Sequence, residues 1–339
     1  MLGKGENMIK VESLGKEFKI SKKYPGFKGA IKSFFSTEYS IKKAVDGISF
    51  EISDGEIVGY IGANGAGKST TIKMMTGILT PTSGKVLVND LIPYENREEN
   101  AKNIGVVFGQ KTQLWWDLPI SETFSLLKDI YNVSDEDFQE RMSFFNEILG
   151  LEEFFLNPVR TLSLGQRMRA DLAAALIHNP KVIYLDEPTI GLDVVVKEKV
   201  RKAIKEINQK YNTTVILTTH DLNDIEELCN RIIIIDKGKK IYDGELDGVK
   251  EKFGYLTTVE IQIKENLNLK EFNEFDEMQR DDEFKLEYKD NKLTITFNKN
   301  KISSVDIIGR VMKKLSVIDF IIKETSIEDI VKKMYRNEV

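Results

Sequence analysis

Apolar residues in this chain follow different periods in different segments. Four short apolar runs, at 57–61, 182–185, 214–218 and 231–235, are each followed by a polar residue or a glycine. Uninterrupted runs of this length are typical of parallel strands that are buried on both faces. Helix-prone segments separate the runs, so the pattern predicts an α/β fold with a mostly parallel sheet covered by helices on both faces.

Residues from about 115 to 175 have a helical pattern instead. Ser134 is a predicted N-cap, and Gly150 marks the predicted end of the helix that it starts. Between them, apolar side chains recur at helical spacing, at Phe138, Met142, Phe145 and Leu149. We therefore predict a helical subdomain within the sheet domain.

The pattern changes again after Gly254. Apolar and polar residues alternate along three segments, at 259–263, 284–288 and 293–297, which is the period of half-buried strands. The remainder is predicted as two helical stretches, a strand and a last helix, near 269–278, 304–315, 317–323 and from Ser326. The resulting order βαββαβ predicts a ferredoxin-like appendage. The predicted domains are therefore 1–253 and 254–339.

The strand predicted at 57–61 leads into a glycine-rich loop. Residues 62–69 read Gly-Ala-Asn-Gly-Ala-Gly-Lys-Ser and fit G-x-x-x-x-G-K-[ST], with a predicted helix at 70–79. Glycines let backbone N–H groups curl around phosphate oxygens, and the helix N-terminus adds partial positive charge. Lys68 is predicted to reach the β- and γ-phosphates and Ser69 to bind Mg²⁺. The predicted nucleoside triphosphate contacts are Gly62, Asn64, Gly65, Ala66, Gly67, Lys68, Ser69 and Thr70.

Acidic residues follow the strand predicted at 182–185. Asp186 and Glu187 stand at its carboxyl end, the edge where ligands bind in open α/β sheets. Asp186 is predicted to hold Mg²⁺, directly or through water, and Glu187 to polarise the water that attacks the γ-phosphate. His220 follows the strand at 214–218 and is a candidate contact of the same phosphate, although a histidine there is more often a structural hydrogen-bonding residue.

A third motif lies between the phosphate loop and the acidic pair. Ser163 is followed three residues later by Gln166, which is a capping box for the helix predicted at 164–177. A helix N-terminus of this kind offers the Ser163 hydroxyl and backbone N–H groups to a second phosphate. A well-capped helix without a ligand is the alternative.

Together these motifs resemble the ATP-binding subunit of ABC transporters over roughly residues 8–250. Leu162-Ser163-Leu164-Gly165-Gln166 is similar to the family signature Leu-Ser-Gly-Gly-Gln, with Leu164 in place of the first glycine. The resemblance implies a P-loop ATPase cassette in which Ser163, Gly165 and Gln166 contact ATP that is held on the opposite subunit. It also implies that two chains pack head to tail around two nucleotides, either as a homodimer or with a related cassette.

The resemblance assigns further roles one by one. Gln110 corresponds to the glutamine that senses Mg²⁺ and the attacking water, with Gln113 as an alternative. Asp193 resembles the aspartate that signals across the dimer. The aromatic residue that stacks on adenine corresponds to Phe18, and Tyr24 and Tyr39 are the alternatives.

Composition limits the function classes. A formal net charge of −5 argues against a generic binder of nucleic acid. The single cysteine, Cys229, excludes a disulfide framework and suits the cytoplasm. No N-terminal signal and no apolar run of the ~20 residues that a membrane helix needs is present. We therefore expect a peripheral subunit on the cytoplasmic face of the membrane, completed by permease subunits on separate chains.

Two segments suggest contact with the membrane or with a permease. Residues 21–43 carry six lysines and one glutamate interleaved with aromatic residues, which fits either a lipid-facing insertion or a solvated excursion. Trp115 and Trp116, the only tryptophans, lie where the family receives the permease. Exposed, they would be interface anchors; buried, they would be core residues. The C-terminal domain resembles extensions of exporter subunits and is expected to serve dimer contact or regulation.

The predicted function is therefore an ATPase that powers an ABC transporter, an exporter by resemblance. The alternative is a mechanical ATPase of the same superfamily that acts on nucleic acid or ribosomes. Such proteins usually carry long coiled coils or two cassettes, and this chain has one phosphate loop and no sustained heptad run. A P-loop kinase or GTPase is disfavoured by the signature motif and by His220.

Overall fold

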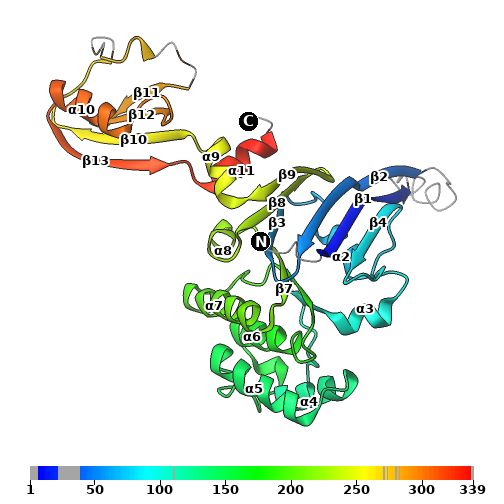
Figure 1. The fold of residues 1–339 in the computed structure, drawn as a ribbon. Helices are drawn as coiled ribbons and strands as arrows, with labels where there is room; N and C mark the ends of the chain where they lie inside the picture. The colour runs from blue at the N-terminus through cyan, green and yellow to red at the C-terminus, as the bar shows by residue number, and fades with distance from the viewer. Residues whose placement is uncertain are drawn as a thin grey trace, which may run out of the picture. The chain divides into compact units, whose positions relative to one another are not determined.

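The computed structural model describes residues 7–21, 39–109, 111–269, 272, 274–278, 281 and 283–336 (Figure 1). The chain divides into two compact units, Met1–Gly244 and Glu245–Val339. The division falls before helix α9 (Leu246–Phe253), whereas the sequence pattern places it after this helix. The reason is packing, because α9 lies against α11 (Ile327–Arg336), and a Cβ on Gly254 would come within 3.2 Å of Ile330 Cδ1.

A six-stranded sheet forms the centre of the N-terminal unit. Its strand order is β5 (Ile104–Phe108), β6 (Val182–Asp186), β7 (Thr214–Thr218), β3 (Ile57–Gly62), β8 (Arg231–Asp236) and β9 (Lys239–Glu245). The first five run parallel. All four apolar runs form strands of this sheet, and nearly all their residues are buried, as expected for strands covered on both faces.

A second, antiparallel sheet covers the start of the chain. Its order is β2 (Tyr39–Ser53), β1 (Asn7–Ser21) and β4 (Ser83–Val88). Helix α2 (Lys68–Met75) contributes Ile72 and Met75 to a core that also contains Val11 of β1 and Tyr60 of β3. The two sheets therefore share one hydrophobic core, and α3 (Arg97–Asn103) precedes the edge strand β5.

The helical subdomain follows β5. It contains α4 (Ile120–Ile130), α5 (Asp135–Leu149), a 3-10 turn (Val159–Thr161) and α6 (Leu164–Ala174). The predicted cap of α5 is confirmed, since Ser134 Oγ accepts from Asp137 N at 3.1 Å and Gly150 ends the helix at φ 60°. The chain then continues through α7 (Val194–Tyr211) and α8 (Leu222–Leu228). In the described part of the chain, no helix has the length and apolar content needed to cross a membrane.

The C-terminal unit is a four-stranded antiparallel sheet in the order β11 (Lys285–Lys289), β12 (Lys292–Asn298), β10 (Leu256–Ile263) and β13 (Val317–Glu324), with α10 (Ser304–Lys314). This strand order is that of the predicted ferredoxin-like arrangement. The helix predicted near 269–278 is wrong for the residues described there, which form turns. Tight hydrogen bonds, such as Met278 N to Phe275 O at 2.9 Å, hold the buried Phe272 and Phe275 against the core without a full helix.

Candidate functional site

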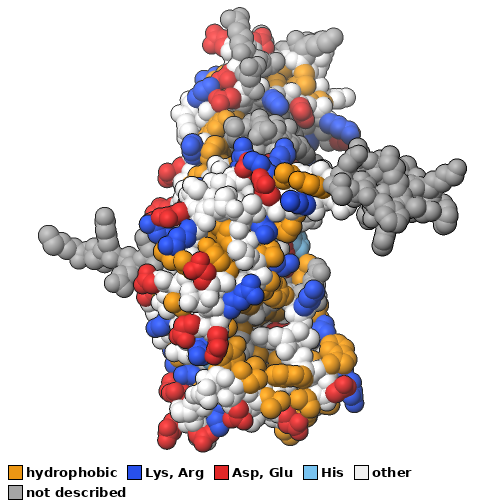
Figure 2. Space-filling model, turned by 90° about the vertical axis from the view of Figure 1, so that its right-hand side faces the viewer, with side chains coloured by type: hydrophobic (Ala, Val, Ile, Leu, Met, Phe, Trp, Pro, Cys, Tyr) orange, Lys and Arg blue, Asp and Glu red, His pale blue; other side chains and the backbone are white. Residues whose placement is uncertain are grey.

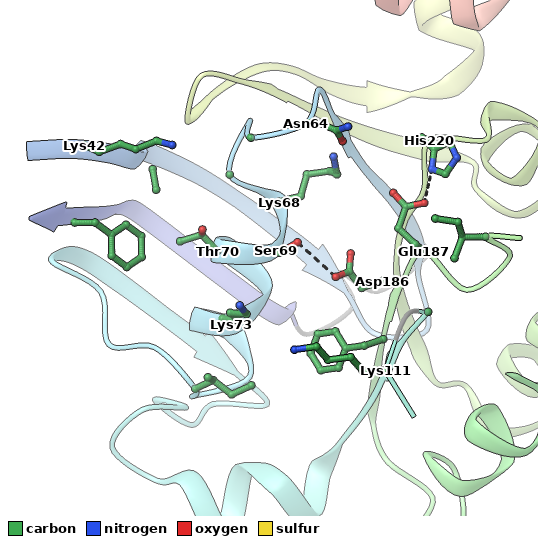
Figure 3. A pocket seen from close by; sticks show the side chains of 18 of the residues that line it. Lys42, Asn64, Lys68, Ser69, Thr70, Lys73, Lys111, Asp186, Glu187 and His220 are labelled. Carbon is green, nitrogen blue, oxygen red and sulfur yellow. Dashed lines mark hydrogen bonds and ion pairs between the residues drawn. The ribbon is translucent and has the colours of Figure 1, made fainter. Parts of the chain in front are cut away.

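One cavity of about 970 Å³ lies at the carboxyl ends of the parallel strands in the N-terminal unit (Figure 3). The phosphate loop and the start of α2 form one wall, and the ends of β5, β6 and β7 form the opposite wall. The predicted site residues that line it are Phe18, Asn64, Gly65, Gly67, Lys68, Ser69, Thr70, Asp186, Glu187 and His220. Residues more than 150 positions apart in the sequence are thereby brought around one space.

The loop between β3 and α2 has the shape of an anion cradle. Gly65 and Gly67 adopt φ angles of 83° and 112°, and a Cβ on Gly67 would lie 2.5 Å from Ala44 O. Only glycine fits both demands at this position. Among the described residues, no side chain caps the start of α2, so its first N–H groups are left for an anionic ligand. Two predicted contacts within the loop, Gly62 and Ala66, do not line the cavity, and Ala66 is buried.

Lys68 is held above this cradle. Its ammonium donates to Gly62 O at 2.6 Å and approaches Ala63 O at 3.4 Å. Burial lowers the pKa of Lys68 below the ordinary lysine value, and the carboxylates of Glu187 and Asp186 oppose this shift. The cation therefore faces the cavity from the loop side, while both acids face it from the sheet side (Figure 3).

The acidic side of the cavity presents oxygen donors. Ser69 Oγ lies 3.4 Å from Asp186 Oδ2, and Thr218 Oγ1 donates to Asp186 Oδ1. A hydroxyl and a carboxylate are ligands that Mg²⁺ accepts, with phosphate oxygens and water completing its octahedron. No group of three or more His, Cys, Asp or Glu residues in the described ranges forms a metal cage. The donor set fits a Mg²⁺ ion that arrives with a phosphate ligand.

Glu187 and His220 form a contact at the mouth of the cavity. His220 Nδ1 lies 2.6 Å from Glu187 Oε2 (Figure 3). Glu187 N donates to Thr218 O at 2.9 Å. Glu187 has a φ angle of 58°, which is uncommon for a non-glycine residue and is concentrated at functional sites. The strand end and its histidine partner therefore orient the carboxylate toward the space beside the phosphate loop.

An apolar wall closes the other end of the cavity. Phe18 lies on β1 together with Ile20, and Ile78 faces the same space from beyond α2. Tyr39 is not among the lining residues, and Tyr24 lies outside the described residues. Of the two described candidates for the adenine, Phe18 and Tyr39, the geometry therefore favours Phe18, whose ring also lies 5.5 Å from Lys16 Nζ.

Three lining lysines were missed by the sequence reasoning. Lys42, Lys73 and Lys111 reach the cavity from β2, α2 and the segment after β5 (Figure 3). Lys73 stands one helical turn after Ser69, so its spacing already places it on the same face of the helix. Lys42 and Lys111 carried no such signal, because only the fold brings their segments to the cavity. The three cations add positive charge around a predicted polyphosphate site.

Of the two candidate glutamines after β5, the structure describes only Gln113. Gln110 lies outside the described residues. Its alternative, Gln113, donates through Nε2 to Asp171 O at 3.0 Å and therefore points to α6 and not into the cavity. Asp171 also accepts from Thr112 Oγ1 at 2.9 Å and from Gln113 N at 3.0 Å. This carboxylate fastens the segment after β5 to the helix that begins at the signature.

The signature residues lie outside the cavity. The capping box at the start of α6 is confirmed, with Ser163 Oγ accepting from Gln166 N and Gln166 Oε1 accepting from Ser163 N. Leu164 turns toward its own chain, since its Cδ2 lies 3.1 Å from a Cβ built on Gly191. Ser163 stays exposed.

Asp193, the predicted signalling aspartate, caps α7 by accepting from Val196 N at 3.0 Å. A Cβ on Gly165 would meet Val196 at 3.0 Å.

The buried Asp171 leads to a testable pH effect. Burial raises its pKa from 3.8 to about 6, against the hydrogen bonds from Gln113 and Thr112. The pKa of this carboxyl is higher in the folded than in the unfolded state, so the unfolded chain releases the proton first as pH rises. The free energy of unfolding therefore falls between about pH 4 and about pH 6. Asp171→Asn keeps an oxygen acceptor but cannot ionise. Between pH 4 and 7 we expect wild type to lose about 3 kcal/mol of stability relative to this variant. Urea midpoints measured across this range test the effect, and parallel curves contradict it.

Comparisons with known proteins agree with the geometry. The family model described as ABC transporter matches residues 45–190, which span the phosphate loop, the signature and the acidic pair. The ATP-binding protein NatA of Bacillus subtilis is 30% identical over 217 residues, which are 64% of this chain and 88% of that protein. The cholesterol transporter ABCA5 of Rattus norvegicus is 32% identical over 253 residues, 74% of this chain, but the chain spans only 15% of that protein's length.

A solved structure extends the similarity to three dimensions. It is the dimeric post-hydrolysis state of the ATP-binding cassette MJ0796 bound to ADP and Pi, with a TM-score of 0.57 and 29% identity. The match covers 70% of this chain and 99% of that one. A relative that is 30% identical and matched over 88% of its own length shows the family. The chain therefore belongs to the ATP-binding subunits of ABC transporters and is an ATPase coupled to transport.

Proposed function

We propose that two copies of this cassette close head to tail around two ATP–Mg²⁺ and that this closure drives separate permease subunits. The observation that carries the proposal is the division of the phosphate-binding groups within one chain. The phosphate loop, Asp186 and Glu187 line the cavity, whereas the exposed helix start at Ser163 stands outside it. A second chain that presents its own Ser163 to the open side of the cavity completes the site.

In this proposal the residues of the cavity divide the chemistry of hydrolysis. Ser69 and Asp186 hold Mg²⁺, which neutralises charge on the phosphates, and Lys68 supplements it. Glu187 polarises the attacking water, since its carboxylate faces the same space. His220 holds that carboxylate through the contact at 2.6 Å. Phe18 stacks on the adenine at the apolar end. Catalysis then rests on positioning and charge neutralisation.

A permease is the proposed partner of the helical subdomain. Trp115 and Trp116 are 41% and 50% exposed, so they meet the condition for interface anchors and not for core residues. Other large apolar side chains of this subdomain, Leu126, Ile130 and Leu156, are also exposed. Figure 2 shows hydrophobic side chains gathered at the lower end of the molecule, at the height where Figure 1 draws α4 and α5. Aromatic anchors in such a patch suit a membrane protein's cytoplasmic helix.

Replacing Trp115 and Trp116 by alanine is expected to uncouple the subunit. Each anchor contributes about 2 kcal/mol or more in a typical hot spot, so loss of one weakens binding to the permease about 30-fold and loss of both by up to about 1,000-fold. ATP affinity of the purified subunit stays unchanged, because neither tryptophan lines the cavity. The readout is recovery of multi-span partners from solubilised membranes with the tagged variant.

The matched control is Ile241→Ala, which removes an exposed apolar side chain from β9, away from this subdomain. Full recovery with the double tryptophan variant contradicts the proposed interface.

The direction of transport is proposed as export, on the resemblance of the signature and of the segment after β5 to exporter subunits. Transport assays in membrane vesicles of defined orientation decide this direction. The proposed location is the cytoplasmic face of the membrane.

A further inference from the structure

Strand β13 is an open edge of the C-terminal sheet. Among the described residues only β10 pairs with it, and no other described strand lies along its opposite side (Figure 1). It is eight residues long and carries four exposed large apolar side chains, Ile318, Phe320, Ile321 and Ile322. Natural edge strands are usually short, charged or covered, because an open apolar edge recruits another strand. The exposed edge of β13 therefore favours pairing with a partner strand.

The backbone of β13 directs pairing groups to the side away from β10. Phe320 N donates to the side chain of Asp319 at 2.8 Å. Its register partner Ile261 directs its backbone groups to β12, as Ile263 N does to Asn291 O, so the backbone groups of Phe320 point away from β10.

Because alternate residues of a strand direct their N–H and C=O groups to the same side, Ile322 also directs its groups outward. The register shift between Val317 and Asp319 makes Ile318 a bulge residue, so the alternation holds only from Asp319 onward. These groups are in place to form an antiparallel ladder with another strand.

We propose that this partner is β13 of a second copy of the chain, in an antiparallel pair centred on Ile321. In this register Phe320 of one copy lies opposite Ile322 of the other, and both residues have outward backbone groups. Ile321 lies opposite itself. Asp319 lies opposite Lys323, and the two-fold symmetry produces this ion pair twice.

The distribution of charge selects this register and this occupant. Glu260 contacts both Lys292, at 2.9 Å, and Lys323, so these three side chains together carry one lysine charge in excess. Asp319 has no cationic partner among the described residues. A pair centred on Phe320 places Asp319 opposite Ile321, and a pair centred on Ile322 places Lys323 opposite Ile321. Neither of these registers brings opposite charges together. Of these three registers, only the one centred on Ile321 places the Asp319 carboxylate opposite Lys323.

The consequence is a dimer contact that does not depend on nucleotide. It keeps two copies together after the ATP sites open, so each closing event starts from a tethered pair and not from separate chains. The contact lies outside the nucleotide cavity. A failed test therefore leaves the proposed function in place.

Disulfide trapping of the full-length chain tests the pair directly. The only native cysteine, Cys229, is buried. Ile321→Cys places two thiols opposite each other in a non-hydrogen-bonded pair, where Cα atoms lie about 4.5 Å apart and a disulfide can form. Ile318→Cys is the matched control, since Ile318 is 55% exposed and Ile321 53%, but the register separates the two introduced thiols of this control by about 20 Å. Without nucleotide, we expect Ile321→Cys to cross-link at least about tenfold faster than Ile318→Cys. Equal rates, or no cross-link at position 321, overturn the pairing.

Charge reversal tests the register independently of any new cysteine. Asp319→Lys places two lysines opposite each other, and Lys323→Asp places two aspartates opposite each other, so each variant alone is expected to be monomeric without nucleotide. A mixture of the two restores both ion pairs. Analytical ultracentrifugation of the mixture is expected to show a heterodimer, and failure of the mixture to associate while wild type dimerises contradicts the register. A wild-type chain that is monomeric at about 100 μM without nucleotide overturns the proposal as a whole.

Discussion

Glu187→Gln is expected to bind ATP and to lose hydrolysis, which traps a closed dimer. The amide keeps the size of the side chain but cannot accept the proton of the attacking water. General base catalysis contributes about 10²- to 10⁴-fold, so the turnover number falls by a factor in this range. Loss of a negative charge beside the γ-phosphate leaves ATP affinity unchanged or higher. ATP hydrolysis and the ATP-dependent increase in particle mass are the measurements.

Glu198→Gln is the matched control for this variant, because Glu198 is a glutamate on α7 that does not line the cavity. It is expected to hydrolyse ATP at the wild-type rate. Normal turnover in Glu187→Gln removes Glu187 as the base. Closure is measured as the difference in particle mass with and without ATP. Combining Glu187→Gln with Asp319→Lys removes the proposed nucleotide-free contact through β13, so that contact does not obscure the difference.

Lys68→Ala is expected to abolish tight ATP binding. Lys68 is the cation placed directly above the phosphate loop, and it now donates to Gly62 O at 2.6 Å. Hydrogen bonds to charged groups contribute about 1.5–3 kcal/mol each, so the dissociation constant rises by about 10- to 100-fold for one lost contact and further for two. Titration calorimetry with ATP and Mg²⁺ measures the change.

Lys181→Ala serves as the control, since Lys181 is exposed and lies away from the cavity. It is expected to leave the dissociation constant unchanged. Lys68→Arg retains the charge on a longer, planar group and is expected to bind ATP more weakly than wild type. An unchanged ATP affinity in Lys68→Ala contradicts the assignment of the phosphate loop.

The parts of the fold that the sequence predicts are those with local causes. Short uninterrupted apolar runs such as 182–185 are typical of buried strands, and the Ser163–Gln166 pair satisfies its helix start within four residues. The phosphate loop is equally local, because its glycines are required by backbone angles. The order of these elements then places Asp186 and Glu187 at the same sheet edge as Lys68.

Other features depend on contacts that the sequence pattern does not contain. The buried Phe272 and Phe275 have helical spacing, yet their segment forms turns, because one turn already delivers both rings to the core. Residue spacing made Gln113 the alternative candidate for the glutamine that senses Mg²⁺. In the structure its backbone N–H donates to Asp171, which lies on α6, 58 residues further along the chain. Lys42 and Lys111 become site residues only once β2 and the segment after β5 lie beside the loop.

The measurement that tests the central claim most directly is recovery of partners with tagged Glu187→Gln from detergent-solubilised native membranes in the presence of ATP. The closed variant holds its partners through the isolation, and mass spectrometry identifies them. We expect stoichiometric recovery of multi-span membrane proteins. Recovery of the dimer alone, or of nucleic acid or ribosomes, contradicts it.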